Sequence, residues 1–311
     1  MEFFPKTNNR KPKTENQQPT TDNRQPNKLN IMKRILFPTD FSEASNNAFV
    51  YALKLADAMK AELITLHAYE LPQLHMGGMP NTLKDVYDSI ELENFENFKD
   101  QIPLLRDIAE RYNLGHVKIS NILKHGDLIW TIKKVSKEEN IDYVVMGTKG
   151  ASGLKETFLG SNTGTVITEL EAFVIGVPEH SEYAGIQNIV FTTRFREKDL
   201  KALKKVINLA KLFDAKVHCL YIKTKKTDVN QVVIEDWKFL FKDENIVFHI
   251  FEDENVEQTI LNFVDTYNVD MLAMLNYKRG FFEELFKQSL TQKLSYHVQV
   301  PLLAIHESRL E

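Results

Sequence analysis

The chain carries two copies of one sequence pattern, and this repeat constrains the fold before any motif is considered. Three segments of the first half, 34–41, 61–69 and 142–148, reappear in the same order as 188–195, 215–222 and 270–276. A repeat of this length indicates tandem duplication of one folding unit. We therefore expect two domains of the same architecture, joined by a short connector near residues 179–186.

Each copy alternates short apolar runs with segments of helical periodicity. In the first copy the expected strands are 35–37, 61–68, 117–123, 142–146 and 172–177. Strands separated by helices pair in parallel through right-handed crossovers, so the pattern predicts an α/β fold with two doubly wound parallel five-stranded sheets. A length of 311 residues is sufficient for both. The expected domains are 31–180 and 186–308, and a long helix over 81–112 is expected to kink or break at Pro103.

The first 30 residues differ in composition from the rest of the chain. They are rich in Asn, Gln, Pro, Thr and Lys and contain almost no aliphatic side chains. Such a segment buries too little apolar surface to offset the entropy of ordering it. We expect residues 1–30 to be a disordered N-terminal tail.

The overall composition excludes several classes of function. A net charge of −4 gives no general attraction to nucleic acid or to anionic membranes. No apolar run approaches the ~18 residues that cross a bilayer, and no apolar signal core opens the chain. Cys219 is the only cysteine, so no internal disulfide can form, and its strand-like surroundings indicate a buried thiol. The expected location is cytoplasmic.

The stretch 142–166 carries the clearest chemical motif. An apolar run at 143–146 is followed by Gly147, Gly150 and Gly160, and Ser161 then opens a helical pattern. Spaced glycines between a strand and a helix let the backbone approach an anion, and the N–H groups at the helix start favour negative charge. The motif indicates a site for phosphate groups.

The second copy has lost these features. Leu275 stands where the first copy has Gly147, and the later glycines are replaced as well; Arg194 stands in the place of Asp40, and Thr192 in the place of Pro38. Side chains now occupy positions where backbone would contact a phosphate. A second site of the same kind is therefore not expected, and the sequence predicts one such phosphate site per chain.

Together these motifs resemble the universal stress protein domain, twice in tandem. The resemblance rests on the Gly-x2-Gly-x9-Gly-Ser spacing at 147–161, on the Pro-Thr-Asp-Phe-Ser turn at 38–42 and on the duplication. It implies a Rossmann-like fold, similar to the adenine nucleotide alpha hydrolase fold. It also implies a pseudo-dimer in which the last strands, 173–177 and 302–305, pair within one chain. Further homodimerisation is left open.

The resemblance also implies a ligand, ATP, with Mg²⁺ bound through its phosphates rather than through protein ligands. Pro38 and Thr39 would line the adenosine pocket, with Asp40 at the adenine end and Ala68 against the ring. Gly147 would approach the ribose. The phosphates would contact Gly150, Gly160 and Ser161, with a further hydroxyl from Thr163. The implied role is regulatory or protective in a stress response.

Several alternatives remain open at this stage. Asp40 could act only as a turn residue, the common use of Asp after a strand. His67 fits a packed core histidine better than a base, and residues 125–127 could be a ligand loop or an ordinary helix cap. No catalytic constellation is evident, so we expect a binding protein and not an enzyme, with slow ATP hydrolysis left open. The alternative function is an interaction scaffold without nucleotide, whose protein partners are unknown.

Overall fold

The computed structural model describes residues 32–72, 80–148, 161–225, 227, 229–276 and 300–310. Met32–Glu311 forms one compact unit. The predicted tail at residues 1–30 lies outside the described residues, as do Gly150 and Gly160.

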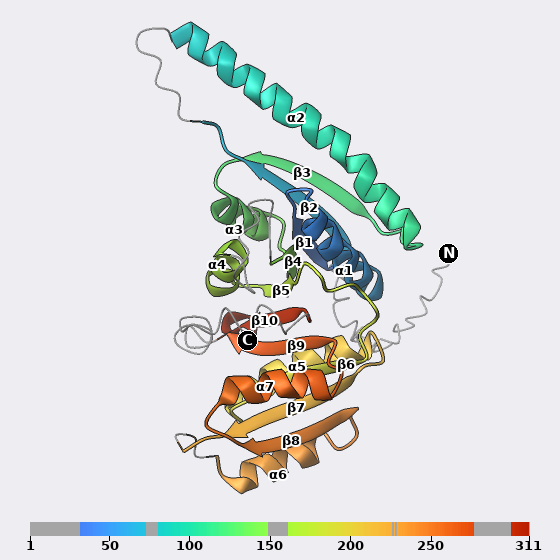
Figure 1. Ribbon diagram of the computed structural model, residues 1–311, viewed down its shortest axis with the longest axis vertical. Coiled ribbons are helices and arrows are strands. Elements are labelled where there is room, and N and C mark those ends of the chain that lie inside the picture. Colours follow the sequence, from blue (N-terminus) through green and yellow to red (C-terminus); the bar gives the residue numbers. More distant parts are fainter. Residues whose placement is uncertain are drawn as a thin grey trace, which may run out of the picture. The chain divides into compact units, whose positions relative to one another are not determined.

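From its first to its fourth strand, each half has the same order of elements (Figure 1). The first half contains β1 (Arg34–Pro38), α1 (Glu43–Met59), β2 (Glu62–Tyr69), α2 (Pro80–Arg111), β3 (Ile119–His125), α3 (Leu128–Glu138), β4 (Tyr143–Gly147), α4 (Ser161–Glu169) and β5 (Phe173–Val177). The second half contains β6 (Asn188–Thr192), α5 (Glu197–Lys211), β7 (Lys216–Lys223), α6 (Gln231–Leu240), β8 (Ile246–Glu252), α7 (Val256–Thr266), β9 (Met271–Asn276), β10 (Leu302–His306) and the short 3-10 helix η1 (Glu307–Leu310).

The strands form one ten-stranded sheet in the order β3-β2-β1-β4-β5-β10-β9-β6-β7-β8. Each five-stranded half is parallel, as the alternating pattern predicts. The halves join where β5 and β10 pair antiparallel, with Leu302 opposite Gly176 and Ile305 opposite Phe173. The doubly wound fold and the pairing of the last strands are confirmed, with the difference that the two sheets merge into one.

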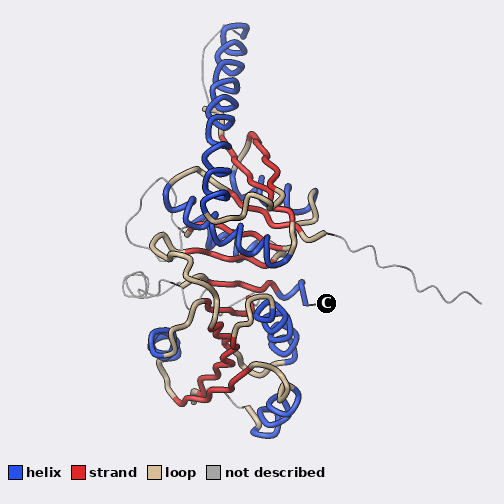
Figure 2. Tube along the Cα trace, turned by 90° about the vertical axis from the view of Figure 1, so that its right-hand side faces the viewer, coloured by secondary structure: helices blue, strands red, loops and turns tan. Residues whose placement is uncertain are grey.

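Helices cover both faces of this sheet (Figure 2). One apolar core packs α1, α2, α5 and α6 against the sheet, and the other packs α3, α4 and α7. Both cores continue from the first half into the second. Strand residues such as Leu36 and Phe37 are fully buried on opposite faces, which explains why these strands are apolar throughout instead of alternating.

The long helix does not break at Pro103. The sequence predicts a kink or break there, and α2 continues as one helix from Pro80 to Arg111 with Pro103 inside it, so the predicted break is wrong. Its C-terminal part is held by buried Leu105, Ile108 and Ala109, which pack on the core around α1. Tertiary packing therefore carries the helix past a residue that removes one backbone hydrogen bond.

No described helix is both long and apolar enough to span a bilayer.

Candidate functional site

The carboxyl ends of β1, β2 and β4 bring together most of the predicted site residues that the structure describes. β1 lies between β2 and β4, with Pro38 opposite Leu66 on β2. The N–H of Thr39 donates to the carbonyl of Leu66 at 2.9 Å. Ala68 lies near the end of β2 and Gly147 at the end of β4. This edge, where the strand order reverses, is where open α/β sheets bind ligands.

The turn after β1 is built by side chains of its own residues. Thr39 Oγ1 accepts the N–H of Phe41 at 3.0 Å and lies 2.8 Å from Ser45 Oγ. This bond supports Phe41 in a left-handed conformation, with φ of 60°. Ser42 then caps α1 by accepting the N–H of Ser45. The buried Thr39–Ser45 contact fixes the turn beside the candidate site, and the sequence motif alone did not reveal it.

Asp40 lies exposed on this turn. Its Oδ1 accepts the N–H of Ser42 at 3.1 Å, which is the turn-residue role considered from the sequence. A carboxylate has capacity for further hydrogen bonds beyond this one. Contact between Asp40 and a ligand stays a prediction.

Thr163 is used differently from expectation. The sequence predicts a hydroxyl for the phosphates, whereas Thr163 is 1% exposed and its Oγ1 donates to the carbonyl of Gly147 at 2.9 Å. Thr163 therefore ties α4 to the end of β4 and fixes the carbonyl of a predicted ligand residue. Ser161 is the first residue of α4, at the helix start that the motif predicts.

Two neighbouring motifs have structural partners. His67 Nδ1 lies 2.8 Å from the carbonyl of Thr39, and its ring packs against Phe41 and Phe98. Asp127 caps α3 by accepting the N–H of Trp130 at 2.8 Å, after Gly126 turns with φ of 136°. The packed histidine and the helix cap are thus the roles that the contacts support.

The second domain repeats the turn with different chemistry. Thr193 Oγ1 accepts the N–H of Phe195 at 2.8 Å, and Phe195 has φ of 54°. In the place of Ser45 stands Asp199, which is 1% exposed and accepts from Thr193 Oγ1, the N–H of Arg194 and the N–H of Arg196, at 3.2, 2.7 and 3.2 Å. The backbone of the turn is kept although the residue after its threonine changes from Asp40 to Arg194.

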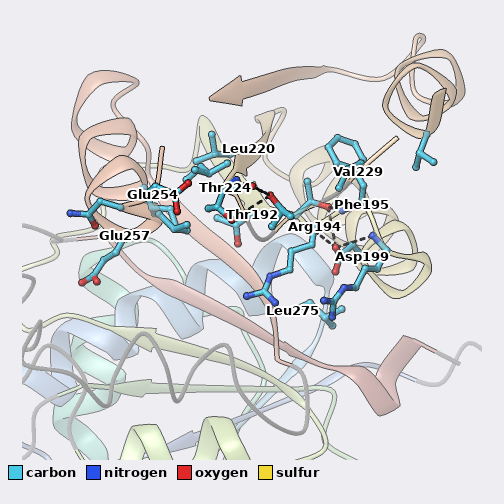
Figure 3. Close-up of a pocket in the computed structure, with 18 of the residues that line it drawn as sticks. Thr192, Arg194, Phe195, Asp199, Leu220, Thr224, Val229, Glu254, Glu257 and Leu275 are labelled. Carbon is cyan, nitrogen blue, oxygen red and sulfur yellow. Dashed lines mark hydrogen bonds between the residues drawn. The ribbon is translucent and has the colours of Figure 1, made fainter. Parts of the chain in front are cut away.

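A cavity of about 910 Å³ opens at the carboxyl ends of the second-domain strands. Thr192, Leu220 and Leu275 line it from β6, β7 and β9, and Arg194 projects from the turn (Figure 3). Strand register places Leu275 at the position of Gly147 and Ile222 at that of Ala68. The sequence comparison correctly identifies Leu275, but it predicted neither Ile222 at the position of Ala68 nor a cavity of this size beside them.

The cysteine thiol and the possible metal ligands limit the chemistry that the described residues can carry out. Cys219 is fully buried, as expected, and burial raises the pKa of its thiol, so it is not a nucleophile. Within the described ranges, no group of three His, Cys, Asp or Glu side chains could hold a metal ion.

Comparison with known proteins agrees with this architecture. The sequence model of the universal stress protein family matches residues 32–178 and again 185–306. Universal stress protein MJ0577 of Methanocaldococcus jannaschii is 27% identical over 145 residues, which are 43% of this chain and 88% of that protein. Universal stress protein YxiE of Bacillus subtilis is 27% identical over 131 residues, with 42% and 88% covered.

The fold of the whole chain also has a solved counterpart. A universal stress protein from Archaeoglobus fulgidus superposes with a TM-score of 0.64 at 18% identity, covering 88% of this chain and 96% of that one. The likeness shows a shared fold. Since the family model matches both halves, the chain belongs to the universal stress protein family, as a member with two domains in tandem.

Proposed function

We propose that the first domain binds an adenine nucleotide, with ATP as the ligand, and that the protein acts through nucleotide occupancy and not through catalysis. The observation that carries this proposal is Gly147. It ends β4 at the sheet edge shared with Pro38, where the second domain has Leu275, whose side chain is 3% exposed. A leucine therefore fits the fold at this position, so the fold alone does not require the glycine. Close approach of a ligand to the backbone is the better reason for it.

The described residues fit this ligand. Ala68 leaves room beside the strand end where the second domain has Ile222, and Thr39 with Asp40 offers polar groups at the same edge. Gly147 would lie against the ribose. The motif assigns the phosphates to Gly150, Gly160 and Ser161; of these, Ser161 lies at the start of α4, where backbone N–H groups favour negative charge. Mg²⁺ would be held through the phosphates, and a cytoplasmic location belongs to the same proposal.

The test is a substitution that copies the second domain. Gly147→Leu should weaken ATP binding by roughly tenfold or more, measured by isothermal titration calorimetry against the unchanged protein. Gly115→Leu is the matched control, because the close neighbour of a side chain there is the flexible end of Glu110. The control should bind ATP normally. AMP and ADP, titrated in parallel, would identify the preferred nucleotide.

Two outcomes would contradict the proposal. If the unchanged protein binds no adenine nucleotide in solution and retains none in native mass spectrometry, an interaction scaffold becomes the better function. If Gly147→Leu binds ATP as tightly as the unchanged protein, the nucleotide lies elsewhere. If ATP turnover disappears in Gly147→Leu and persists in Gly115→Leu, the function at this site is slow ATP hydrolysis and not regulation by bound nucleotide alone.

A further inference from the structure

Nucleotide binding in the first domain does not account for the second-domain cavity. Its volume of about 910 Å³ lies within the range of small-molecule sites, ~300–1,000 Å³. It opens at the ends of β6, β7 and β9, the edge where doubly wound sheets bind ligands. The site is thus retained as a space although its glycine motif is lost.

Three replacements change which ligand this space can accept. Leu275 replaces Gly147 and prevents contact between a ligand and the backbone of β9. Ile222 replaces Ala68 and adds apolar surface at the end of β7. Arg194 replaces Asp40, which reverses the charge on the turn. The cavity therefore differs from the first-domain site in shape, in apolar surface and in the charge at the turn.

Apolar side chains from four elements form part of the cavity wall beside its polar residues. Leu220 and Ile222 contribute from β7, Val233 from α6, Ile260 from α7 and Leu275 from β9. All of these except Val233 are less than a tenth exposed. These side chains are held by the two cores on either side of the sheet, so the apolar surface is fixed in place. It suits an aliphatic or aromatic body.

The positive charge comes from the turn after β6. Figure 3 shows the Arg194 side chain extending among the residues that line the cavity, and Arg196 lines it as well. Asp199 supports the turn, because its carboxylate accepts from the Thr193 hydroxyl and from two backbone N–H groups. A guanidinium has five N–H donors, so Arg194 can bind a carboxylate while it keeps other contacts.

The wall at the start of α7 is acidic. Glu254 and Glu257 line the cavity there, and Glu254 has no counterpart in the shorter first-domain turn, which passes from Gly126 directly to the cap Asp127. Glu254 Oε1 accepts the N–H of Lys225 at 2.8 Å, which holds the side chain at this wall. Two carboxylates on one wall would repel a phosphate chain that extended toward them. A ligand with a single negative charge can stay beside the arginines.

We propose that the second-domain cavity binds an organic monocarboxylate with an apolar body, its carboxylate on Arg194 and its body against Leu220, Ile222 and Leu275. The tandem chain would then carry two different ligand sites. The first site would bind a nucleotide, and the second would bind an apolar acid.

The test uses probes that differ in charge and share one body. 3-Phenylpropanoate should bind. Comparing its affinity with that of octanoate shows whether the cavity prefers an aromatic or an aliphatic body on the acid. The neutral 3-phenylpropan-1-ol and the cationic 3-phenylpropylamine should each bind at least roughly tenfold more weakly than 3-phenylpropanoate. Binding is measured by isothermal titration calorimetry with the full chain, and by ligand-observed NMR where affinity is low.

The decisive variant is Arg194→Asp, which installs the residue that the first domain carries on the same turn. It should weaken acid binding by roughly tenfold or more and leave ATP binding unchanged. Lys205→Asp, on the exposed face of α5, makes the same change of charge outside the cavity and should bind acid normally. Trp237 fluorescence verifies that both variants keep the second-domain core.

The proposal is overturned if neither acid binds, if the alcohol or the amine binds as tightly as the acid, or if Arg194→Asp leaves acid binding unchanged. These outcomes are independent of nucleotide binding. Gly147→Leu, which tests the first domain, should not alter the affinity for 3-phenylpropanoate.

Discussion

At the residue scale, one buried position supports the turn after the first strand in each domain. Ser45 is 5% exposed and shares one hydrogen bond with the Thr39 hydroxyl, whereas Asp199 is 1% exposed and accepts three. Hydrogen bonds to a charged acceptor stabilise more than neutral ones. The second domain thus depends more strongly on this position, next to its cavity, than the first domain does.

This difference predicts unequal costs for the same substitution. Asp199→Ala leaves the buried Thr193 hydroxyl and two N–H groups without their acceptor and should lower the free energy of unfolding by about 2–3 kcal/mol. Ser45→Ala, the matched control in the first domain, should lower it by only about 1 kcal/mol. Urea denaturation followed by far-UV circular dichroism measures both. Equal costs would show that Asp199 is not the main support of its turn.

At the scale of elements, β7 and β8 are linked by a histidine pair. His218 Nδ1 lies 3.0 Å from His249 Nε2, and His218 Nε2 lies 3.3 Å from Asn188 Oδ1. Since the amide oxygen can only accept, His218 donates from Nε2 and accepts at Nδ1 from His249. Both rings pack on Phe263 and Tyr267 of α7. Protonation of His218 at Nδ1 would remove the acceptor that joins the strands.

The pair predicts acid sensitivity of the second domain. Burial, with smaller effects of His249 and Lys216, lowers the pKa of His218 to about 4, and burial lowers the pKa of His249. The unfolded chain, with His pKa ~6.5, then binds more protons than the folded one as pH falls through 6.5 toward 4. The stabilisation that comes from keeping these histidines neutral is present in full above pH ~6.5 and is lost as the pH falls. Between pH 7 and 5 the loss should be roughly 1–2 kcal/mol.

Urea denaturation at a series of pH values, read from Trp237 fluorescence in a Trp130→Phe background, tests this assignment. The double variant His218→Gln/His249→Gln keeps neutral hydrogen-bonding groups but cannot titrate in this range. It should be less stable at pH 7 and show a flatter profile down to pH 5. A profile as steep as that of the unchanged pair would locate the acid sensitivity elsewhere.

Elements were more predictable than the contacts between them. The cap of α1 can be read from local sequence, because Ser42 directly precedes the helix and its side chain accepts the N–H of Ser45. The continuation of α2 past Pro103 was not predicted, because packing of its C-terminal part overrides the preference of proline to end a helix. The use of Thr163 inside the fold depends on the position of Gly147, sixteen residues earlier. The cavity was missed because it arises where several strand ends and loops meet, which no single motif encodes.

At the scale of the whole molecule, β10 joins the two domains into one sheet. It pairs with β9 of its own half and with β5 of the other, and Leu302–Ile305 are each 1% exposed. Beyond the strands, Asn276 Nδ2 donates to the carbonyl of Ile167 on α4 at 2.7 Å. Arg309 donates to the carbonyls of Glu171 and Ile141, at 2.6 and 2.8 Å. Second-domain residues thus satisfy carbonyl groups around α4, the helix that opens at Ser161.

These contacts predict that the two domains unfold as one unit. In a Trp130→Phe background, the urea transition seen by far-UV circular dichroism should coincide with that seen by Trp237, which is buried in the second domain. Asn276→Ala leaves the carbonyl of Ile167 without its donor, at a cost of about 1–3 kcal/mol, and Arg309→Ala removes two further donors. In the double variant the Trp237 transition should come first. Two transitions that still coincide at unchanged midpoints would mean that the β5–β10 pairing alone couples the domains.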